Sequence, residues 1–447
     1  MRRSLVLKLG TVGVLIVLIL VGLAWIDSLV GERQARRDEV VRDIQRSSTY
    51  DQQLTAPLLV VPYQKTQKGW VEDPDTKERR FEERRVAGEL RFLPETLKLD
   101  GQMQTERRAR GIYQTRLYHA RVRLAGTFEL PANAGIDSDL SAYQFGQPFI
   151  AVGVTDIRGI EQISTLDVSG TAVKFAAGTG TTLLSAGVHA ILPPVPLDAP
   201  SHLSFSWEMS IEGTGQLQIT PVGRQTRVTL TSNWPNPNFV GDYLPTQHQI
   251  DPRGFSAIWE TSFFSTNLEE VLRNCSQTPT CAALTGLHFG VTLADPVDQY
   301  LESDRSIKYA LLFILPTFAG FFLFEVLQSL AVHPIQYGLA GAALAVFYLL
   351  LLSLSEHIGF ALAYLASSSA CVALIGFYVC HVLRSVRRGL GFAAGLSTLY
   401  AFLYAILGAE DYALLAGSLL VFGLLAAVMI MTRRVNWSDL DIQRRPS

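Results

Sequence analysis

The chain has 447 residues, of which 48% are hydrophobic and 17% are charged, and its mean hydropathy is +0.22. Soluble globular domains carry about 25% charged residues, so this composition argues against a protein that is soluble throughout. The net charge of −2 gives no indication of a nucleic-acid partner. Four cysteines are too few for a disulfide-rich scaffold.

The first predicted element is an uncharged run from Leu9 to Ile26, LGTVGVLIVLILVGLAWI. As a helix it is roughly 27 Å long, close to the ~30 Å hydrocarbon core of a bilayer. A cleaved signal peptide is the alternative, because a basic N-terminus precedes the run and small residues near its end resemble a cleavage site. The run is longer than the apolar region of a typical signal peptide and continues past that site, which favours an uncleaved membrane anchor.

Next comes a charged segment, GERQARRDEVVRDIQRSS (31–48), which predicts a helix leaving the membrane. A solvated stalk is favoured here over a charged docking surface. Beyond it, apolar residues recur at every second position in three stretches: ARVRLAGTFEL (120–130), LSFSWEMSIEG (203–213) and QLQITPVGRQTRVTLTSNW (216–234). Such alternation is typical of half-buried strands. It predicts a β-rich domain, antiparallel and sandwich-like, built as one unit or as two smaller ones.

The C-terminal part contains five apolar runs, each about the length of one membrane crossing. They are 309–324, 338–355, 360–380, 390–407 and 412–431. The predicted fold class is therefore an α+β membrane protein with one N-terminal transmembrane helix, a large β-rich extracytoplasmic domain and a C-terminal bundle of five transmembrane helices. The predicted divisions are 1–30 for the N-terminal tip and first helix, 31–308 for the stalk and β-rich domain, 309–431 for the five helices, and 432–447 for the tail.

The short loops predict the orientation of this bundle. The loop after the run 360–380 and the C-terminal tail together contain seven arginines, whereas the loops after 338–355 and 390–407 contain no Lys or Arg. Basic residues favour the cytoplasmic side. With six spans, both termini are predicted to be cytoplasmic and the 27–308 loop to lie outside.

One stretch of the β-rich region, TSNWPNPNFVGDYLP (231–245), is rich in prolines and aromatic residues. Prolines stiffen the backbone, and Trp234, Phe239 and Tyr243 offer rigid apolar faces that suit a glycan or a peptide. The alternative is a stiff loop that closes the edge of a sheet. We favour the loop, and keep the three aromatic residues as candidate binding residues.

Ionisable residues near membrane spans are costly and often functional. Glu325 follows the run 309–324, and Glu356 with His357 lies between the runs 338–355 and 360–380. A transporter would bring such groups together near the midplane of the bilayer. Their places at the ends of spans favour interfacial anchoring over a permeation route.

The catalytic motifs of phosphate loops, zinc helices, serine hydrolases and dithiol redox proteins are absent from the sequence. The sequence therefore predicts no enzyme activity, no cofactor and no metal site. Cys275 and Cys281 enclose five residues on the predicted oxidising side of the membrane, where a local disulfide is permitted. A metal site there is disfavoured, because His288 has no carboxylate nearby to complete a ligand set.

The arrangement of one span, a long β-rich loop and five spans resembles the CreD family of bacterial inner-membrane proteins. The segments that carry the resemblance follow the chain from end to end: LTAPLLVVP (54–62), LTSNWPNPNFVGDYLP (230–245), ADPVDQYLESDRSIKYALLFI (294–314), HPIQYGLAG (333–341), FYLLLLSLSEHIGF (347–360) and TRRVNW (432–437). Ala56 stands where the family pattern has a glycine before the proline.

The resemblance implies a cell-envelope integrity protein, produced under a carbon-source-responsive two-component system and linked to envelope stress and β-lactam tolerance. It implies no catalytic residues. The predicted function is thus a non-enzymatic inner-membrane protein whose periplasmic β domain binds or braces a periplasmic protein or cell-wall component, with the lipid bilayer as its other partner. The alternative is a transporter or channel with the β domain as a capture module.

Overall fold

The computed structural model describes residues 2–72, 79–136, 139–275, 281–293, 298–328, 332–408 and 412–433. The chain forms two compact units, a helical unit made of 1–39 and 297–447 and a β unit made of 40–296. The predicted stalk-and-domain segment 31–308 is therefore longer at both ends than the compact β unit. Most of the predicted tail, from residue 434 onward, lies outside the described residues.

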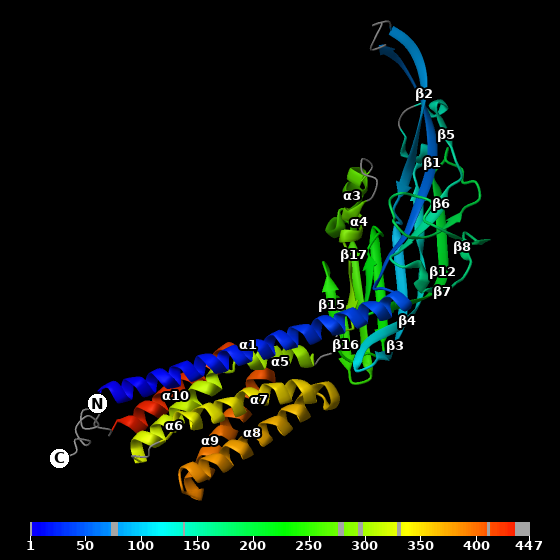
Figure 1. The fold of residues 1–447 in the computed structure, drawn as a ribbon. Helices are drawn as coiled ribbons and strands as arrows, with labels where there is room; N and C mark the ends of the chain where they lie inside the picture. The colour runs from blue at the N-terminus through cyan, green and yellow to red at the C-terminus, as the bar shows by residue number, and fades with distance from the viewer. Residues whose placement is uncertain are drawn as a thin grey trace, which may run out of the picture. The chain divides into compact units, whose positions relative to one another are not determined.

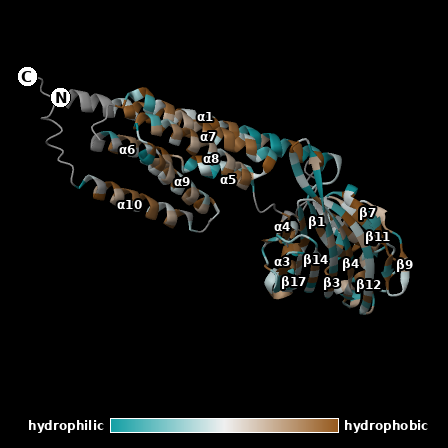
Figure 2. Ribbon diagram, turned by 90° about the horizontal axis from the view of Figure 1, so that it is seen from below, coloured by the Kyte–Doolittle hydropathy of each residue, from teal (hydrophilic) through white to brown (hydrophobic). Residues whose placement is uncertain are grey.

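Long apolar helices make up the helical unit, and hydrophobic residues dominate α7 and α10 (Figure 2). The helices are α1 (Arg2–Ser47), α5 (Gln299–Lys308), α6 (Leu311–Gln328), α7 (Pro334–Ile358), α8 (Phe360–Val382), α9 (Val386–Gly408) and α10 (Ala413–Thr432). The charged stalk is helical as predicted, because α1 continues without a break to Ser47 and its last turns belong to the β unit. The helices α7, α8 and α9 pack in sequence order, and α5 lies against α7 and α9.

In the described part of the chain, four helices are long and apolar enough to cross a membrane: α1, α7, α8 and α9. A fifth crossing is possible if α5 and α6 form one span, bent by 43° between Lys308 and Leu311. The apolar part of α10, Leu414–Ile430, is shorter than the other four helices. The predicted runs thus coincide with apolar helices, and the count of six spans stays a prediction.

The helices α1 and α7 run parallel along a shared seam. Gly338 faces Leu15, Gly341 faces Ile19, and Arg33 lies 3.9 Å from the Glu356 carboxylate. These three contacts keep an almost constant offset between the two helices over roughly 27 Å of helix. Both helices therefore begin on the same side of the bundle, as the parity of the predicted spans requires.

The β unit contains two sheets of nine described strands each (Figure 1). The first sheet has the order β10-β11-β6-β1-β13-β18-β15, with β2 and β5 also paired to β1. Its strands are β1 (Gln52–Glu72), β2 (Arg79–Phe92), β5 (Tyr143–Phe145), β6 (Phe149–Val154), β10 (Ala176–Ala177), β11 (Gly187–Ile191), β13 (Gln216–Thr220), β15 (Asn238–Gly241) and β18 (Phe289–Thr292).

The second sheet has the order β16-β17-β14-β3-β4-β12-β8-β9, with β7 also paired to β12. Its strands are β3 (Thr96–Arg110), β4 (Tyr113–Leu130), β7 (Ile160–Ile163), β8 (Leu166–Val168), β9 (Thr171–Val173), β12 (Ser201–Thr214), β14 (Gln225–Ser232), β16 (Gln247–Asp251) and β17 (Gly254–Ser262). Short helices accompany the sheets: η1 (Ala132–Gly135), η2 (Leu140–Ala142), η3 (Ile157–Gly159), α2 (Phe263–Thr266), α3 (Leu268–Asn274) and α4 (Ala282–Gly286).

The predicted antiparallel arrangement is wrong for two strand pairs. The strands β1 and β13 pair in parallel, and so do β3 and β14. In each pair the chain makes a long excursion through other strands before it returns, and alternation within one strand does not report the direction of its neighbour. The domain is therefore a mixed β domain.

Both sheets contribute to a single hydrophobic core. Leu58 and Val152 from the first sheet and Leu124 and Trp259 from the second are almost completely buried in it. The strand β12 alternates buried and more exposed positions along its length, as its sequence predicted. This continuous core makes the β-rich region one large unit.

Candidate functional site

The proline-rich stretch 231–245 crosses from one sheet to the other. It leaves β14 in the second sheet and forms β15, the outermost strand of the first. Trp234, between the two strands, has only 7% of its surface exposed. Its indole nitrogen donates to the Asn236 carbonyl at 2.7 Å, and the Arg116 guanidinium lies 3.7 Å from its ring centre.

The other two aromatic residues of this stretch also face the core. The ring of Phe239 packs edge-on against Phe255 and Trp259, with centroids 5.8 and 5.6 Å apart. Tyr243 donates to the Ser265 carbonyl at 2.9 Å, and burial raises its pKa above the ordinary value of 10. The faces that could stack on a glycan are used in packing, so the stretch serves as the wall of the domain.

The three ionisable residues singled out from the sequence, Glu325, Glu356 and His357, do not form one cluster. Glu325 in α6 accepts a hydrogen bond from Tyr337 at 3.0 Å, near the start of α7. Glu356 and His357 lie near the end of α7, where the His357 ring is bonded to the Ser353 carbonyl. Tyr337 and Glu356 are nineteen positions apart in α7, which corresponds to roughly 28 Å.

Glu356 takes part in a polar network at the end of α7. Its side chain is only 8% exposed, and it accepts a hydrogen bond from Tyr300 at 3.0 Å. Arg37 forms a 2.6 Å ion pair with Asp298, and its guanidinium lies 5.5 Å from the centre of the Tyr300 ring. The network ties α1, α5 and α7 together, and interfacial anchoring in the membrane stays a prediction.

The cysteines of the β unit lie at the ends of a short segment. Cys275 and Cys281 are joined as a disulfide, with Cα atoms 5.3 Å apart and both side chains buried. The residues between them lie outside the described ranges. Cys371 and Cys380 in α8 are free.

The most exposed aromatic pair of the β unit lies on the β1–β2 hairpin. Up to Lys65, β1 also pairs with β5, but farther along it pairs with β2 alone. We call residues 66–72 and 79–85 the arm, and it extends past the other strands of the unit (Figure 1). Trp70 and Phe81 face each other across the arm with centroids 5.4 Å apart, and they are 68% and 52% exposed.

A polar cavity of about 920 Å³ lies at the base of the arm. Arg85, Glu89 and Arg91 of β2 contribute charged groups to its lining. Glu89 accepts hydrogen bonds from Thr181 at 2.8 Å and from Arg91 at 3.3 Å. A Cβ on Gly88 would collide with the Tyr63 ring, so glycine is needed where that ring crosses β2.

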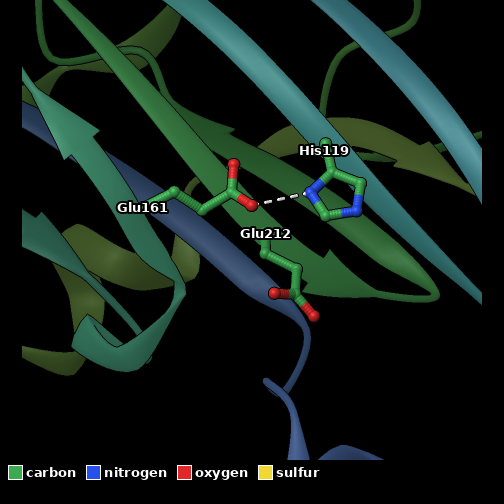
Figure 3. Close-up of side chains that lie close together, drawn as sticks. All are labelled: His119, Glu161 and Glu212. Carbon is green, nitrogen blue, oxygen red and sulfur yellow. Dashed lines mark hydrogen bonds and ion pairs between the residues drawn. The ribbon is translucent and has the colours of Figure 1, made fainter.

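One group of side chains among the described residues could share a metal ion: His119, Glu161 and Glu212 (Figure 3). They come from β4, β7 and β12 of the second sheet, and one ligand atom from each lies within 4.8 Å of the others. The sequence alone does not reveal this group, because the nearest two of its members are 42 residues apart along the chain. No short motif encodes such a set.

These observations define a class of protein: a multi-pass membrane protein with an apolar N-terminal helix, several apolar C-terminal helices and one large mixed β domain. A family model described as inner membrane protein CreD matches residues 4–438. The inner membrane protein CreD of Escherichia coli (strain K12) is 34% identical over 435 residues, which cover 96% of this chain and 93% of that protein. The chain belongs to the CreD family of inner membrane proteins.

Solved structures give much weaker similarity. A crystal structure of an M1 zinc metallopeptidase from Deinococcus radiodurans has 8% identity and a TM-score of 0.20, and the match covers 45% of this chain and 42% of that one. A mutant form bound to a Tyr-Ser-Ala substrate has 10% identity and a TM-score of 0.20, and covers 38% and 39%. TM-scores this low support no conclusion about fold or function.

Proposed function

We propose that this inner-membrane protein is a non-enzymatic envelope integrity protein, whose β domain lies in the periplasm and binds or braces another envelope component through the arm. The observation that carries the proposal is the exposed Trp70–Phe81 pair on a two-stranded ribbon. An isolated two-stranded hairpin is marginally stable in water. A partner that covers the arm would bury both rings and stabilise the ribbon.

The chemistry of the arm favours a protein as the partner. Tryptophan and other large aromatic residues dominate the energetics of protein interfaces. Among the described residues β2 pairs with β1 alone, so its other edge presents free backbone N–H and C=O groups over 79–92. Such an edge can accept an extended segment of another chain, while the charged cavity beneath the arm offers polar contacts beside it.

The helical unit gives less support to transport. Glu325 and Glu356, which suggested a permeation route, lie near opposite ends of α7 and accept separate hydrogen bonds from Tyr337 and Tyr300. A cavity of about 640 Å³ between α6, α9 and α10 is lined by apolar side chains apart from Thr317. Such a lining suits hydrocarbon and offers an ion few ligands.

A photo-crosslinking amino acid tests the role of the arm in intact cells. It replaces Trp70 in one variant and Phe81 in another, and we expect both to capture the same envelope protein. Phe264 is the matched control, because it is an aromatic residue of the same unit and is 83% exposed. We expect no capture of that protein from position 264.

Two outcomes would contradict the proposal. One is recovery of lipid adducts alone from positions 70 and 81. The other is the same set of proteins from position 264 as from the arm. Capture of a glycan polymer in place of a protein would support the arm as the binding surface but would show that the partner is a glycan.

A further inference from the structure

A β-bulge places an acidic side chain beside a cross-strand His–Glu pair in the second sheet. His119 of β4 lies directly opposite Glu212 of β12 in the antiparallel ladder. On the other side of β12, Ile160 pairs with Ile211 and Gln162 with Ser210, so Glu161 is the extra residue of a bulge in β7. Bulges commonly re-aim a side chain, and this one turns Glu161 toward the His119 ring (Figure 3).

The three donor groups are close enough to converge on one ion. His119 Nδ1 lies 2.8 Å from Glu161 Oε1, and all three ligand atoms lie within 4.8 Å of one another. A four-coordinate metal with bonds of about 2.1 Å holds its ligands roughly 3.4 Å apart. Small rotations of these side chains would close the remaining gap, and the 42% and 38% exposure of His119 and Glu161 leaves room for them.

The local charges also favour a cation. Two carboxylates face one imidazole, and among the described residues the Glu212 carboxylate has no hydrogen bond or ion pair. Arg121, two residues along β4 on the same face, forms no ion pair with either carboxylate in the described structure. Like charges this close are unfavourable in the absence of a counter-charge, and a divalent cation supplies it.

We propose that His119, Glu161 and Glu212 bind a divalent transition-metal ion on the β domain, with zinc as the best match. Zinc accepts imidazole nitrogen and carboxylate oxygen as ligands, and a site with three protein ligands takes water in the fourth position. Calcium and magnesium prefer all-oxygen sites, so the imidazole selects against them. A bound ion would link β4, β7 and β12 through their side chains, in addition to the backbone hydrogen bonds that already pair these strands.

The strands β4 and β12 also contain a second His–Glu pair that serves as a natural control. His202 of β12 lies directly opposite Glu129 of β4, with Nδ1 and Oε1 3.6 Å apart. This pair repeats the cross-strand pairing of His with Glu, but it does not belong to any group of three possible ligands in the described structure. A histidine–carboxylate pair alone holds a metal weakly, so only the group with Glu161 is expected to bind firmly.

The test uses the full chain, purified in detergent without a histidine tag and stripped of metal. Titration with Zn²⁺ by calorimetry should show one tight site in the unmodified protein. We expect Glu212→Gln and His119→Ala each to weaken binding by at least about tenfold, because mutation of a mere hydrogen-bond partner of a metal ligand already costs about 10–100-fold. Glu129→Gln and His202→Ala should bind like the unmodified protein.

A second measurement separates binding from folding. Saturating Zn²⁺ should raise the melting temperature of the unmodified protein and of the Glu129→Gln variant, but not that of Glu212→Gln. Near-UV circular dichroism establishes that the variants remain folded. The proposal is overturned if the unmodified protein takes up no Zn²⁺ at micromolar concentration, if Ca²⁺ binds and Zn²⁺ does not, or if the His202 and Glu129 variants lose binding equally.

Discussion

Asp156 joins the start of the β unit to the turn after β6. Its carboxylate accepts hydrogen bonds from the Tyr50 backbone at 3.3 Å and from the Arg158 side chain at 2.6 Å. Its backbone is held by both ends of the Gln52 side-chain amide, at 2.9 and 3.1 Å. One residue therefore fixes where the chain leaves α1 and enters β1.

The bonds of Asp156 make a pH-dependent prediction. The Arg158 side chain is the main cause that lowers the pKa of Asp156 below its ordinary 3.8. A carboxylate whose pKa is lowered by folding contributes its full stabilisation at pH values above its ordinary pKa. This contribution is lost as the pH falls through the pKa of the folded state. Asp156→Asn should cost about 1–2 kcal/mol at pH 7. Its melting temperature should also fall less steeply than that of the unmodified protein below about pH 4.

Thermal melts of the full chain at pH 7, 4 and 3 measure both effects. Asp139→Asn is the control, because the Asp139 carboxylate bonds to Ser141 within the same exposed turn and joins no distant segments. We expect the control to change the pH 7 melting temperature much less. Equal effects of the two substitutions would show that Asp156 does not hold the junction.

At the scale of elements, α7 carries the seam of the helical unit. Small residues let helices approach closely in membranes. A Cβ on Gly341 would overlap the tip of Ile19 and come within 3.0 Å of the Phe318 ring, whereas a Cβ on Gly338 finds Leu15 at an ordinary 3.5 Å. The two glycines lie on one face of α7, but only Gly341 is sterically required.

This difference predicts the effect of two alanine substitutions. Gly341→Ala should destabilise the bundle by about 1 kcal/mol, near the low end for overpacking because the end of Ile19 can move. Gly338→Ala should be neutral or slightly stabilising, since alanine is the better helix former. Thermal unfolding in detergent measures both stability changes. The rate at which the free cysteines Cys371 and Cys380 react with a thiol reagent reports the unfolding.

A double-mutant cycle identifies the contact responsible. Ile19→Ala removes the side chain that Gly341→Ala would strike, so the double variant should be more stable than the sum of the single effects predicts. Strict additivity would mean that the two helices do not touch at this position.

At the scale of the whole molecule, two hydrophobic cores divide the chain. One lies within the sheets of the β unit and the other among α1 and the C-terminal helices. The parallel course of α1 and α7 places their first residues on the same side of the bundle, and the positive-inside rule predicts that this side is cytoplasmic. This orientation is part of the proposal that the β domain is periplasmic.

Cysteine labelling tests the orientation. His357→Cys lies at the exposed end of α7 and Arg387→Cys at the exposed start of α9. In a background without Cys371 and Cys380, a membrane-impermeant maleimide should label position 357 in intact spheroplasts. It should label position 387 only after the membrane is opened. The reverse pattern would place the β domain in the cytoplasm and exclude a periplasmic partner.

The sequence by itself determined the apolar helices, the β-rich character of the middle of the chain, and strands within 120–130, 203–213 and 216–234. Runs such as 338–355 and the alternation in 203–213 are local patterns, and burial in lipid or on one face of a sheet follows from them directly. Contacts between residues far apart in the sequence depend instead on how strands and helices pair. Only the tertiary structure decided that Trp234 packs inward, that Glu325 of α6 and Glu356 lie near opposite ends of α7, and that a bulge brings Glu161 to His119 and Glu212. Those outcomes depend on strand register and helix packing between distant segments, which local composition does not specify.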